Sequence, residues 1–189
     1  MIARYLLQNF IPYAQYRTPS KYHDIALVEL QENISFNKYV VPICPDFQTE
    51  DLPVTENLTV ADGVVSNHLM YAPVRTLPLE VCKAAYADPN LSMILQNKLS
   101  SGVIDKQYCA VGNFTENPFD NIDACQGDSG GPLQGLRNNT VFLIGVISAG
   151  IGCGSALPGL YARVGSYFEW IYTTITESES RQTCPPNRS

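Results

Sequence analysis

The stretch IDACQGDSGGPL at residues 122–133 places Ser129 between an acid and two glycines, four residues after a cysteine. A serine hydroxyl in this setting is a candidate nucleophile, although it reacts well only when a base accepts its proton. Attack on an acyl carbon builds negative charge on an oxygen, which backbone N–H groups must stabilise. Gly127 permits a tight turn in which its own amide and that of Ser129 form such an oxyanion hole. A lone Ser-Gly-Gly is more often a plain turn than a nucleophile site. The remainder of the chain therefore decides between these two interpretations.

The 189-residue chain is acidic, with a formal net charge of −6 and a pI near 4.8. This charge argues against a nucleic-acid surface, and no apolar run approaches the roughly 20 residues that span a membrane. The six cysteines favour an oxidising compartment. Two isolated histidines without zinc-type cysteine spacing argue against a metal site, and we expect no cofactor.

Sequons for N-glycosylation are frequent, and together they favour a secreted, glycosylated chain. They begin at Asn33, Asn57, Asn90, Asn113, Asn138 and Asn187. The first ten residues, MIARYLLQNF, are nevertheless too short and too polar for a signal peptide. We therefore expect the chain to be a fragment or its signal to lie further upstream.

Short strand patterns separated by turn signals predict an all-β barrel or sandwich. The apolar run 24–30 predicts a buried strand. Residues 57–65 and 70–79 have β character, and 140–150 form a strong strand pattern after the turn-like LRNNT.

Helical patterns are fewer and are followed by a polar tail. Residues 78–88 predict a short helix, and residues 166–177 predict a terminal helix. Val164, Phe168, Ile171 and Ile175 recur at helical spacing, which predicts that this face packs inward. We expect a domain over 1–177 and a polar C-terminal tail over 178–189.

The whole string GDSGGPL at 127–133 resembles the signature of the trypsin and chymotrypsin family. YHDIALVEL resembles the family's strand that carries the triad aspartate, and YFEWI resembles its terminal helix. GVISAGIGCGSALPGLYARV resembles its substrate-binding strand and pocket rim. The resemblance implies a trypsin-like double β-barrel with a C-terminal helix, and YRTPSKYHDIAL and VVPICP look most like arthropod proteases with an N-terminal clip domain.

The resemblance also assigns roles by position. Ser129 is implied as the nucleophile, Asp24 as the orienting carboxylate, and the amides of Gly127 and Ser129 as the oxyanion hole. Asp123 falls at the base of the specificity pocket, where a carboxylate favours a substrate Arg or Lys. The remaining implied residues are Ser148 for substrate binding, Gly150 and Gly159 at the pocket walls, and Asp128 as partner of a newly formed N-terminus.

The family pattern pairs four of the cysteines, as Cys82–Cys109 and Cys125–Cys153. Cys44 and Cys184 are left over. In the clip-domain relatives the cysteine at the VPICP position bonds the activation linker, which is absent here. A Cys44–Cys184 pair is the alternative.

No residue of the chain fits the catalytic base. The family's histidine lies tens of residues before its aspartate, in an Ala-Ala-His-Cys motif, and only 23 residues precede Asp24. His23 adjoins Asp24, and neighbouring side chains on a strand point to opposite faces. His68 lies in a loop that the family places at the rim of the cleft. We therefore expect an N-terminally truncated chain with an incomplete first barrel and no catalytic histidine.

Three functions remain open at this point. The first is a secreted trypsin-like endopeptidase, cleaving after Arg or Lys through an acyl-enzyme, of which these residues are an inactive portion. The second is a non-catalytic protease homologue that binds or regulates other proteins. The third is an incomplete sequence that is never made as a protein in this form. Expected partners are protein substrates, serpin-type inhibitors and an upstream activating protease, with neither nucleic acid nor membrane.

Overall fold

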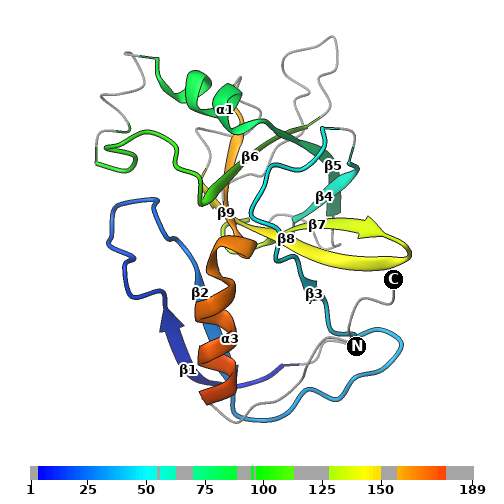
Figure 1. The fold of residues 1–189 in the computed structure, drawn as a ribbon. Coiled ribbons are helices and arrows are strands. Elements are labelled where there is room, and N and C mark those ends of the chain that lie inside the picture. Colours follow the sequence, from blue (N-terminus) through cyan, green and yellow to red (C-terminus); the bar gives the residue numbers. More distant parts are fainter. Residues whose placement is uncertain are drawn as a thin grey trace.

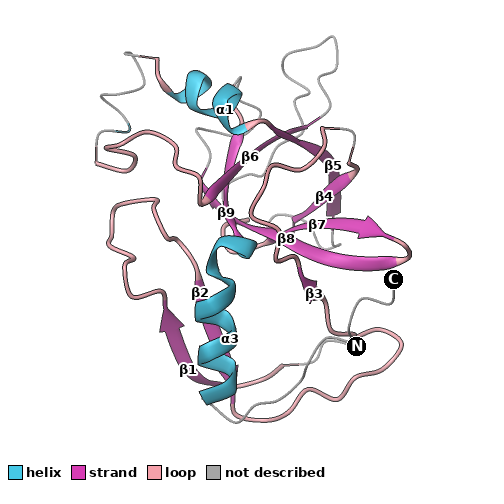
Figure 2. Cartoon of the chain, in the orientation of Figure 1, coloured by secondary structure: helices cyan, strands magenta, loops and turns pink. Residues whose placement is uncertain are grey.

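The computed structural model describes residues 4–54, 56–62, 70–88, 95, 97–112, 128–149 and 157–177. The described elements are mostly strands, and Figures 1 and 2 show their arrangement. In chain order they are β1 (Leu7–Pro12), β2 (Ala26–Leu30), β3 (Cys44–Pro45), β4 (Leu58–Asp62), β5 (Met70–Leu77), α1 (Leu79–Tyr86), β6 (Gln107–Gly112), β7 (Pro132–Arg137), β8 (Thr140–Ala149), β9 (Gly159–Arg163), η2 (Val164–Tyr167) and α3 (Phe168–Glu177).

The larger sheet closes into a barrel. Its strands follow the order β3-β8-β7-β4-β5-β6-β9, and β8 also pairs with β9, so that β4 to β9 form a ring. Each of these strands contributes to one buried cluster, which includes Leu58, Leu133 and Tyr161, all at most 1% exposed. Closure leaves these strands without a free edge. The expected all-β fold with a C-terminal helix is confirmed.

The hairpin between β7 and β8 has the turn that the sequence predicts. Asn138 and Asn139 have φ of 48° and 62°, the left-handed conformation that asparagine tolerates better than most residues. Two successive residues of this kind match the twist of the flanking strands. The strand expected over 140–150 is observed as β8, with residue 150 outside the described part.

The first part of the chain contributes a small separate sheet. β1 pairs with β2 in antiparallel register, and Figure 1 shows α3 in front of β2, alongside this pair of strands. Leu27 of β2 and Ile171 of α3 belong to the same apolar cluster. The strand expected to be buried over 24–30 begins only at Ala26, and Val28 is 49% exposed because one face of this sheet is uncovered.

The terminal helix has the expected position with a narrower buried face. Val164 and Ile171 are buried, Phe168 is half-buried, and Ile175 is 37% exposed. The prediction is wrong for the exposed Ile175, which lies near the C-terminal end of α3, and for the start of the helix, which begins at Phe168 because Val164 lies in the preceding η2. The tail expected over 178–189 lies outside the described residues.

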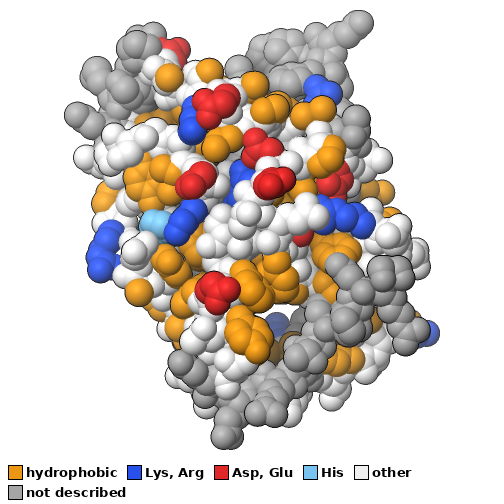
Figure 3. Space-filling view, viewed as in Figure 1, with side chains coloured by type: hydrophobic (Ala, Val, Ile, Leu, Met, Phe, Trp, Pro, Cys, Tyr) orange, Lys and Arg blue, Asp and Glu red, His pale blue; other side chains and the backbone are white. Residues whose placement is uncertain are grey.

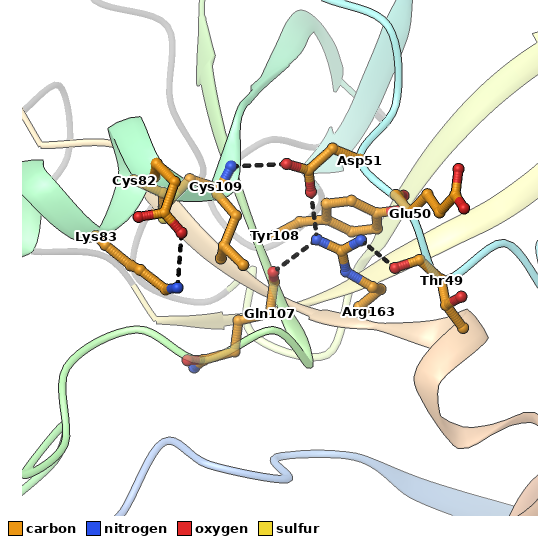
Figure 4. Close-up of polar contacts among 11 residues, drawn as sticks. Thr49, Glu50, Asp51, Cys82, Lys83, Gln107, Tyr108, Cys109 and Arg163 are labelled. Carbon is orange, nitrogen blue, oxygen red and sulfur yellow. Dashed lines mark hydrogen bonds and ion pairs between the residues drawn. A yellow bond between two sulfur atoms is a disulfide. The ribbon is translucent and has the colours of Figure 1, made fainter.

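A buried arginine joins the segment before β4 to the barrel, as Figure 4 shows. The side chain of Arg163 is 3% exposed and donates to the carboxylate of Asp51 at 2.6 Å and to the carbonyl of Thr49 at 2.7 Å. Its guanidinium also lies 3.9 Å from the ring centre of Tyr108. Asp51 in turn accepts the backbone N–H of Leu79, the first residue of α1, at 2.8 Å.

The surface seen in Figure 3 carries acidic and basic side chains interspersed among apolar ones. The net negative charge is therefore not gathered into one patch on that face. Among the described helices, none is long and apolar enough to span a membrane.

Candidate active site

The turn that carries Ser129 is attached to strand β8. The N–H of Gly130 donates to the carbonyl of Ile147 at 2.8 Å, and the N–H of Ile147 donates to the carbonyl of Gly131 at 2.9 Å. A third bond, from Gly131 N–H to the Asp128 carbonyl at 2.8 Å, closes the turn. Ser129 itself is exposed, so the strand fixes its backbone while its hydroxyl stays accessible.

The two glycines after Ser129 are needed for different reasons. Gly130 has φ of +86°, a conformation that side chains with a Cβ rarely adopt. A Cβ on Gly131 would lie 2.8 Å from the Asp128 carbonyl oxygen and 3.1 Å from Ile147 Cδ1. Gly130 is therefore required by its backbone conformation, and Gly131 is required because neighbouring atoms leave no room for a Cβ.

Asp24 is attached to the next residue of the same strand. Its Oδ2 accepts a hydrogen bond from Ser148 Oγ at 2.7 Å, across 124 positions of sequence. Ser148 is 3% exposed, so this contact is largely shielded from water. The adjacent residues Ile147 and Ser148 therefore hold the Ser129 turn and Asp24 respectively, which brings the two predicted residues to one end of β8.

Asp24 has a second partner that the sequence analysis missed. Lys21 Nζ lies 3.1 Å from the same Oδ2 atom, and both side chains are about a quarter exposed, at 27% and 26%. The turn that carries both residues is tied to the other part of the chain through Tyr22. Its hydroxyl donates to the Gly102 carbonyl at 2.8 Å and accepts the Ser101 N–H at 2.7 Å. No sequence motif distinguished Lys21 from other surface lysines.

The contacts described for the His23 side chain are with Tyr13 and Tyr167 and not with Asp24. His23 lies in a turn with φ of 56°, ahead of β2, rather than on the strand from which its direction was inferred. Its ring packs 5.3 Å from that of Tyr13, and Nδ1 is 3.3 Å from the Tyr167 hydroxyl. Burial, with a smaller contribution from Lys106, lowers the pKa of His23 below its usual value. The other histidine, His68, lies outside the described residues.

Comparison with known proteins decides the family. A profile of the trypsin family matches residues 3–171. The chain belongs to the trypsin family.

Relatives of this trypsin-family chain include several arthropod proteases. CLIP domain-containing serine protease C9 of Anopheles gambiae is 50% identical over 176 residues, which cover 90% of this chain and 49% of that protein. Phenoloxidase-activating factor 3 of Holotrichia diomphalia is 34% identical, covering 89% of this chain and 47% of that protein. Serine protease Hayan of Drosophila melanogaster is 34% identical, and the match covers 82% of this chain and 25% of that protein. The chain thus spans about half the length of such relatives, or less.

The other residues implied by the family pattern are only partly described. Asp128 is 5% exposed, directly before Ser129. Gly159 is buried at the start of β9, where it pairs with Ala110 of β6. Gly127, Asp123 and Gly150 lie outside the described residues, so their roles stay predictions.

One of the predicted disulfides of this trypsin-family chain is present. Cys82 of α1 and Cys109 of β6 are bonded, with their Cα atoms 5.8 Å apart. Cys44 is also disulfide-bonded, and its partner is not among the described cysteines. Cys125, Cys153 and Cys184 lie outside the described part of the chain.

The predicted sequons are also partly described. Asn33, Asn57 and Asn138 are exposed, and Asn138 lies in the β7–β8 turn. Asn90, Asn113 and Asn187 lie outside the described residues. Within the described ranges, no three His, Cys, Asp or Glu side chains gather as a metal site would require.

Proposed function

We propose that the protein acts as a secreted trypsin-like serine endopeptidase that cleaves after arginine or lysine. The observation that carries this proposal is the shared support on β8, where Ile147 holds the Ser129 turn and Ser148 holds Asp24. This arrangement presents an exposed serine on a fixed backbone, and the next residue of the same strand holds a carboxylate that can orient a base. Membership of the trypsin family supports the same conclusion.

In the proposed reaction, Ser129 Oγ attacks the carbonyl carbon of the scissile peptide and its proton passes to a base. The amides of Gly127 and Ser129 stabilise the tetrahedral oxyanion, and the leaving amine takes the proton as the acyl-enzyme forms. Water then repeats the attack on the serine ester and releases the acid. Asp123 in the specificity pocket supplies the negative charge that selects a basic side chain.

The base is proposed to come from outside these 189 residues. His23 packs against Tyr13 and Tyr167 and makes no described contact with Asp24. In a different serine protease, loss of the triad histidine lowers turnover on the order of a million-fold. We therefore expect the isolated chain to cleave arginyl substrates only at background rate.

The alternative is a non-catalytic homologue that binds or regulates other proteins. The ion pair between Lys21 and Asp24 favours it, because the ammonium holds the carboxylate oxygen that a histidine N–H would need. The two proposals differ in whether any form of the protein shows turnover that depends on Ser129.

The proposed setting is extracellular. Protein substrates, an upstream activating protease and serpin-type inhibitors are the proposed partners. Activation would create a new N-terminal ammonium that pairs with Asp128. The exposed positions of Asn33, Asn57 and Asn138 suit N-linked sugars, and Cys125–Cys153 and Cys44–Cys184 are the proposed further disulfides.

The deciding experiment determines the intact mass and N-terminal sequence of the natural protein after deglycosylation, and then assays it on an arginyl p-nitroanilide. We expect a protein that begins upstream of Met1, contains a histidine followed by a cysteine, and loses its turnover in the Ser129→Ala variant. A natural protein that begins at Met1 and lacks Ser129-dependent turnover would contradict the proposal of an active endopeptidase. It would support the alternative, a non-catalytic homologue. Turnover by the isolated chain that Ser129→Ala abolishes would contradict its proposed inactivity.

A further inference from the structure

We propose that His23 is a positioning residue, whose left-handed backbone turns the chain so that the carboxylate of Asp24 reaches Ser148. This inference rests on the proposed function, since it explains how the orienting carboxylate of that site is held. The observation behind it is the φ of 56° at His23, directly before Asp24. A non-glycine residue in this conformation stores strain, which persists only where surrounding contacts enforce it.

Histidine is one of the few residue types that suit this backbone position. Asparagine, aspartate and histidine adopt positive φ several-fold more often than other non-glycine residues, whereas a β-branched residue there is an outlier. In the part of the chain that the structure describes, the other non-glycine residues with positive φ are Asn138 and Asn139. Those two close the β7–β8 hairpin, while His23 lies next to a residue of the candidate site.

The two sides of the turn are fixed independently of the Asp24 side chain. On one side, the Tyr22 hydroxyl donates to the carbonyl of Gly102 at 2.8 Å. On the other side, Ile25 is 9% exposed and belongs to the apolar cluster that α3 covers. A change of φ at His23 must therefore be absorbed between these two anchors, which is where Asp24 lies.

The ring of His23 anchors the turn from a further direction. Its centroid lies 5.3 Å from that of Tyr13 and 6.1 Å from that of Tyr167, and Nδ1 is 3.3 Å from the Tyr167 hydroxyl. The Tyr13 ring in turn packs edge-on against Trp170 of α3, with the centroids 5.2 Å apart. The elements η2 and α3 thus hold the ring of His23, while β8 holds the side chain of the next residue, Asp24.

The contacts of Asp24 depend on this turn. The N–H of Ile25 donates to the carbonyl of His23 at 2.8 Å, a contact between residues i and i+2 that spans Asp24 as in a γ-turn. Asp24 Oδ2 accepts from Ser148 Oγ at 2.7 Å, and Ser148 is 3% exposed. Loss of the left-handed conformation at His23 would break the first contact and rotate the carboxylate away from the second.

Crystal structures and amide hydrogen exchange of variants of the 189-residue chain test this geometry without requiring catalysis. In His23→Val, we expect the Ser148–Asp24 contact to lengthen beyond hydrogen-bond reach, because a β-branched residue avoids positive φ. The N–H of Ile25 should then exchange about tenfold faster or more, since its local hydrogen bond is lost. In His23→Asn, which also lacks the ring but tolerates positive φ, both contacts should remain.

Kinetics of the natural protein, measured at pH 8 on the arginyl p-nitroanilide, test the role in the proposed reaction. The pKa of His23 is lowered from its ordinary value, so the ring is neutral at that pH. We expect His23→Val to lower kcat about ten- to hundredfold with KM changed less than about twofold, because a misplaced carboxylate affects the transition state and not substrate binding. His23→Asn should keep kcat within about threefold of the original.

Asn139→Val is the matched control for a purely structural effect. It places a β-branched residue at φ of 62° in the β7–β8 turn and leaves the sequon at Asn138 intact. This variant should lose stability toward urea, as His23→Val does, without changing kcat or the Ser148–Asp24 contact.

Three results would overturn the inference. They are a Ser148–Asp24 contact that survives His23→Val, equal losses in His23→Val and His23→Asn, and a fall of kcat in Asn139→Val as large as that in His23→Val. If His23→Val does not fold, His23→Ala gives the same comparison with His23→Asn, since alanine also disfavours positive φ. If the natural protein shows no turnover that depends on Ser129, the proposed function is wrong, and the crystal structures still decide whether His23 positions Asp24.

Discussion

Removing the carboxylate of Asp51 leaves the buried Arg163 without its charged partner. The Arg163 guanidinium is 3% exposed and Asp51 is 38% exposed, so the two ends of the pair differ in access to water. In Asp51→Ala, Arg163 keeps only neutral partners, which are the Thr49 carbonyl at 2.7 Å, the Gln107 carbonyl at 3.4 Å and the face of the Tyr108 ring at 3.9 Å. A buried charge that loses its counter-ion destabilises a fold strongly.

The expected loss has two parts. A hydrogen bond to a charged group contributes about 1.5 to 3 kcal/mol, and the exposure of Asp51 places this pair near the lower value. Asp51 also accepts the N–H of Leu79 at the start of α1, and loss of such a helix-end acceptor costs about 1 kcal/mol. Asp51→Ala should therefore lower the free energy of unfolding by about 2.5 kcal/mol.

Urea unfolding of the oxidised protein, followed by fluorescence and circular dichroism, measures this loss. With a slope of about 2 kcal/mol/M, the urea concentration at the midpoint should fall by about 1.2 M. Glu80→Ala breaks the exposed pair with Lys83 without removing a charge that acts on Asp51, and it serves as control with an expected change of at most about 1 kcal/mol.

A double-mutant cycle identifies the cause. Arg163→Met removes the buried charge itself. The double variant Asp51→Ala/Arg163→Met should therefore lose about 1 to 2 kcal/mol less stability than the sum of the two single losses. Additive losses, or an Asp51→Ala protein as stable as the control, would refute the argument that the unpaired Arg163 dominates.

The same pair has a pH signature. Burial raises the pKa of Asp51, but the hydrogen bonds from Leu79 and Arg163 and the charges of Arg163 and Lys83 outweigh it, so the net shift is downward. A carboxyl group whose pKa is lowered by folding stabilises the fold at any pH above its ordinary pKa. This contribution is lost as the pH falls below about 4. Asp51→Asn should remove that part of the acid sensitivity.

Three further outcomes are expected. Replacing Cys82 and Cys109 by alanine opens a loop of 27 residues and should cost roughly 3 to 4 kcal/mol in the chain-entropy model, measured by urea unfolding; unchanged stability would contradict it. Gly130→Ala should cost about 1 kcal/mol or more because φ is +86°, and a melting temperature equal to the original would show that the turn relaxes freely. The lowered pKa of His23 means that the fold loses stability as the pH falls through about 6.5, so His23→Asn should flatten the stability profile between pH 5 and 7, and an identical profile would count against it.

The sequence predicted the local features well because their causes are local. The strand over β8, the asparagine turn before it and helix α1 depend on residues close together in the chain. The GDSGG string likewise contains the glycines that the turn at Ser129 requires. The Cys82–Cys109 bond came from the family pattern rather than from local signals.

Other features could not be predicted because they depend on partners far apart in sequence. Nothing near Lys21 indicates that it pairs with Asp24, and Arg163 reaches Asp51 across 112 positions. The direction of His23 was argued from strand alternation, but the backbone turns there with positive φ, and contacts with Tyr13 and Tyr167 hold the ring.

By itself the sequence determined the fold family and named Ser129 and Asp24, since a nucleophile turn needs particular residue types at fixed spacing. Only the tertiary structure decided how the two are brought together. Hydrogen bonds from neighbouring residues of β8 hold each of them, and the pairing of β8 with β7 and β9 in the closed barrel fixes that strand. Such contacts follow from strand register and side-chain packing between distant segments, which the order of residues along the chain does not reveal.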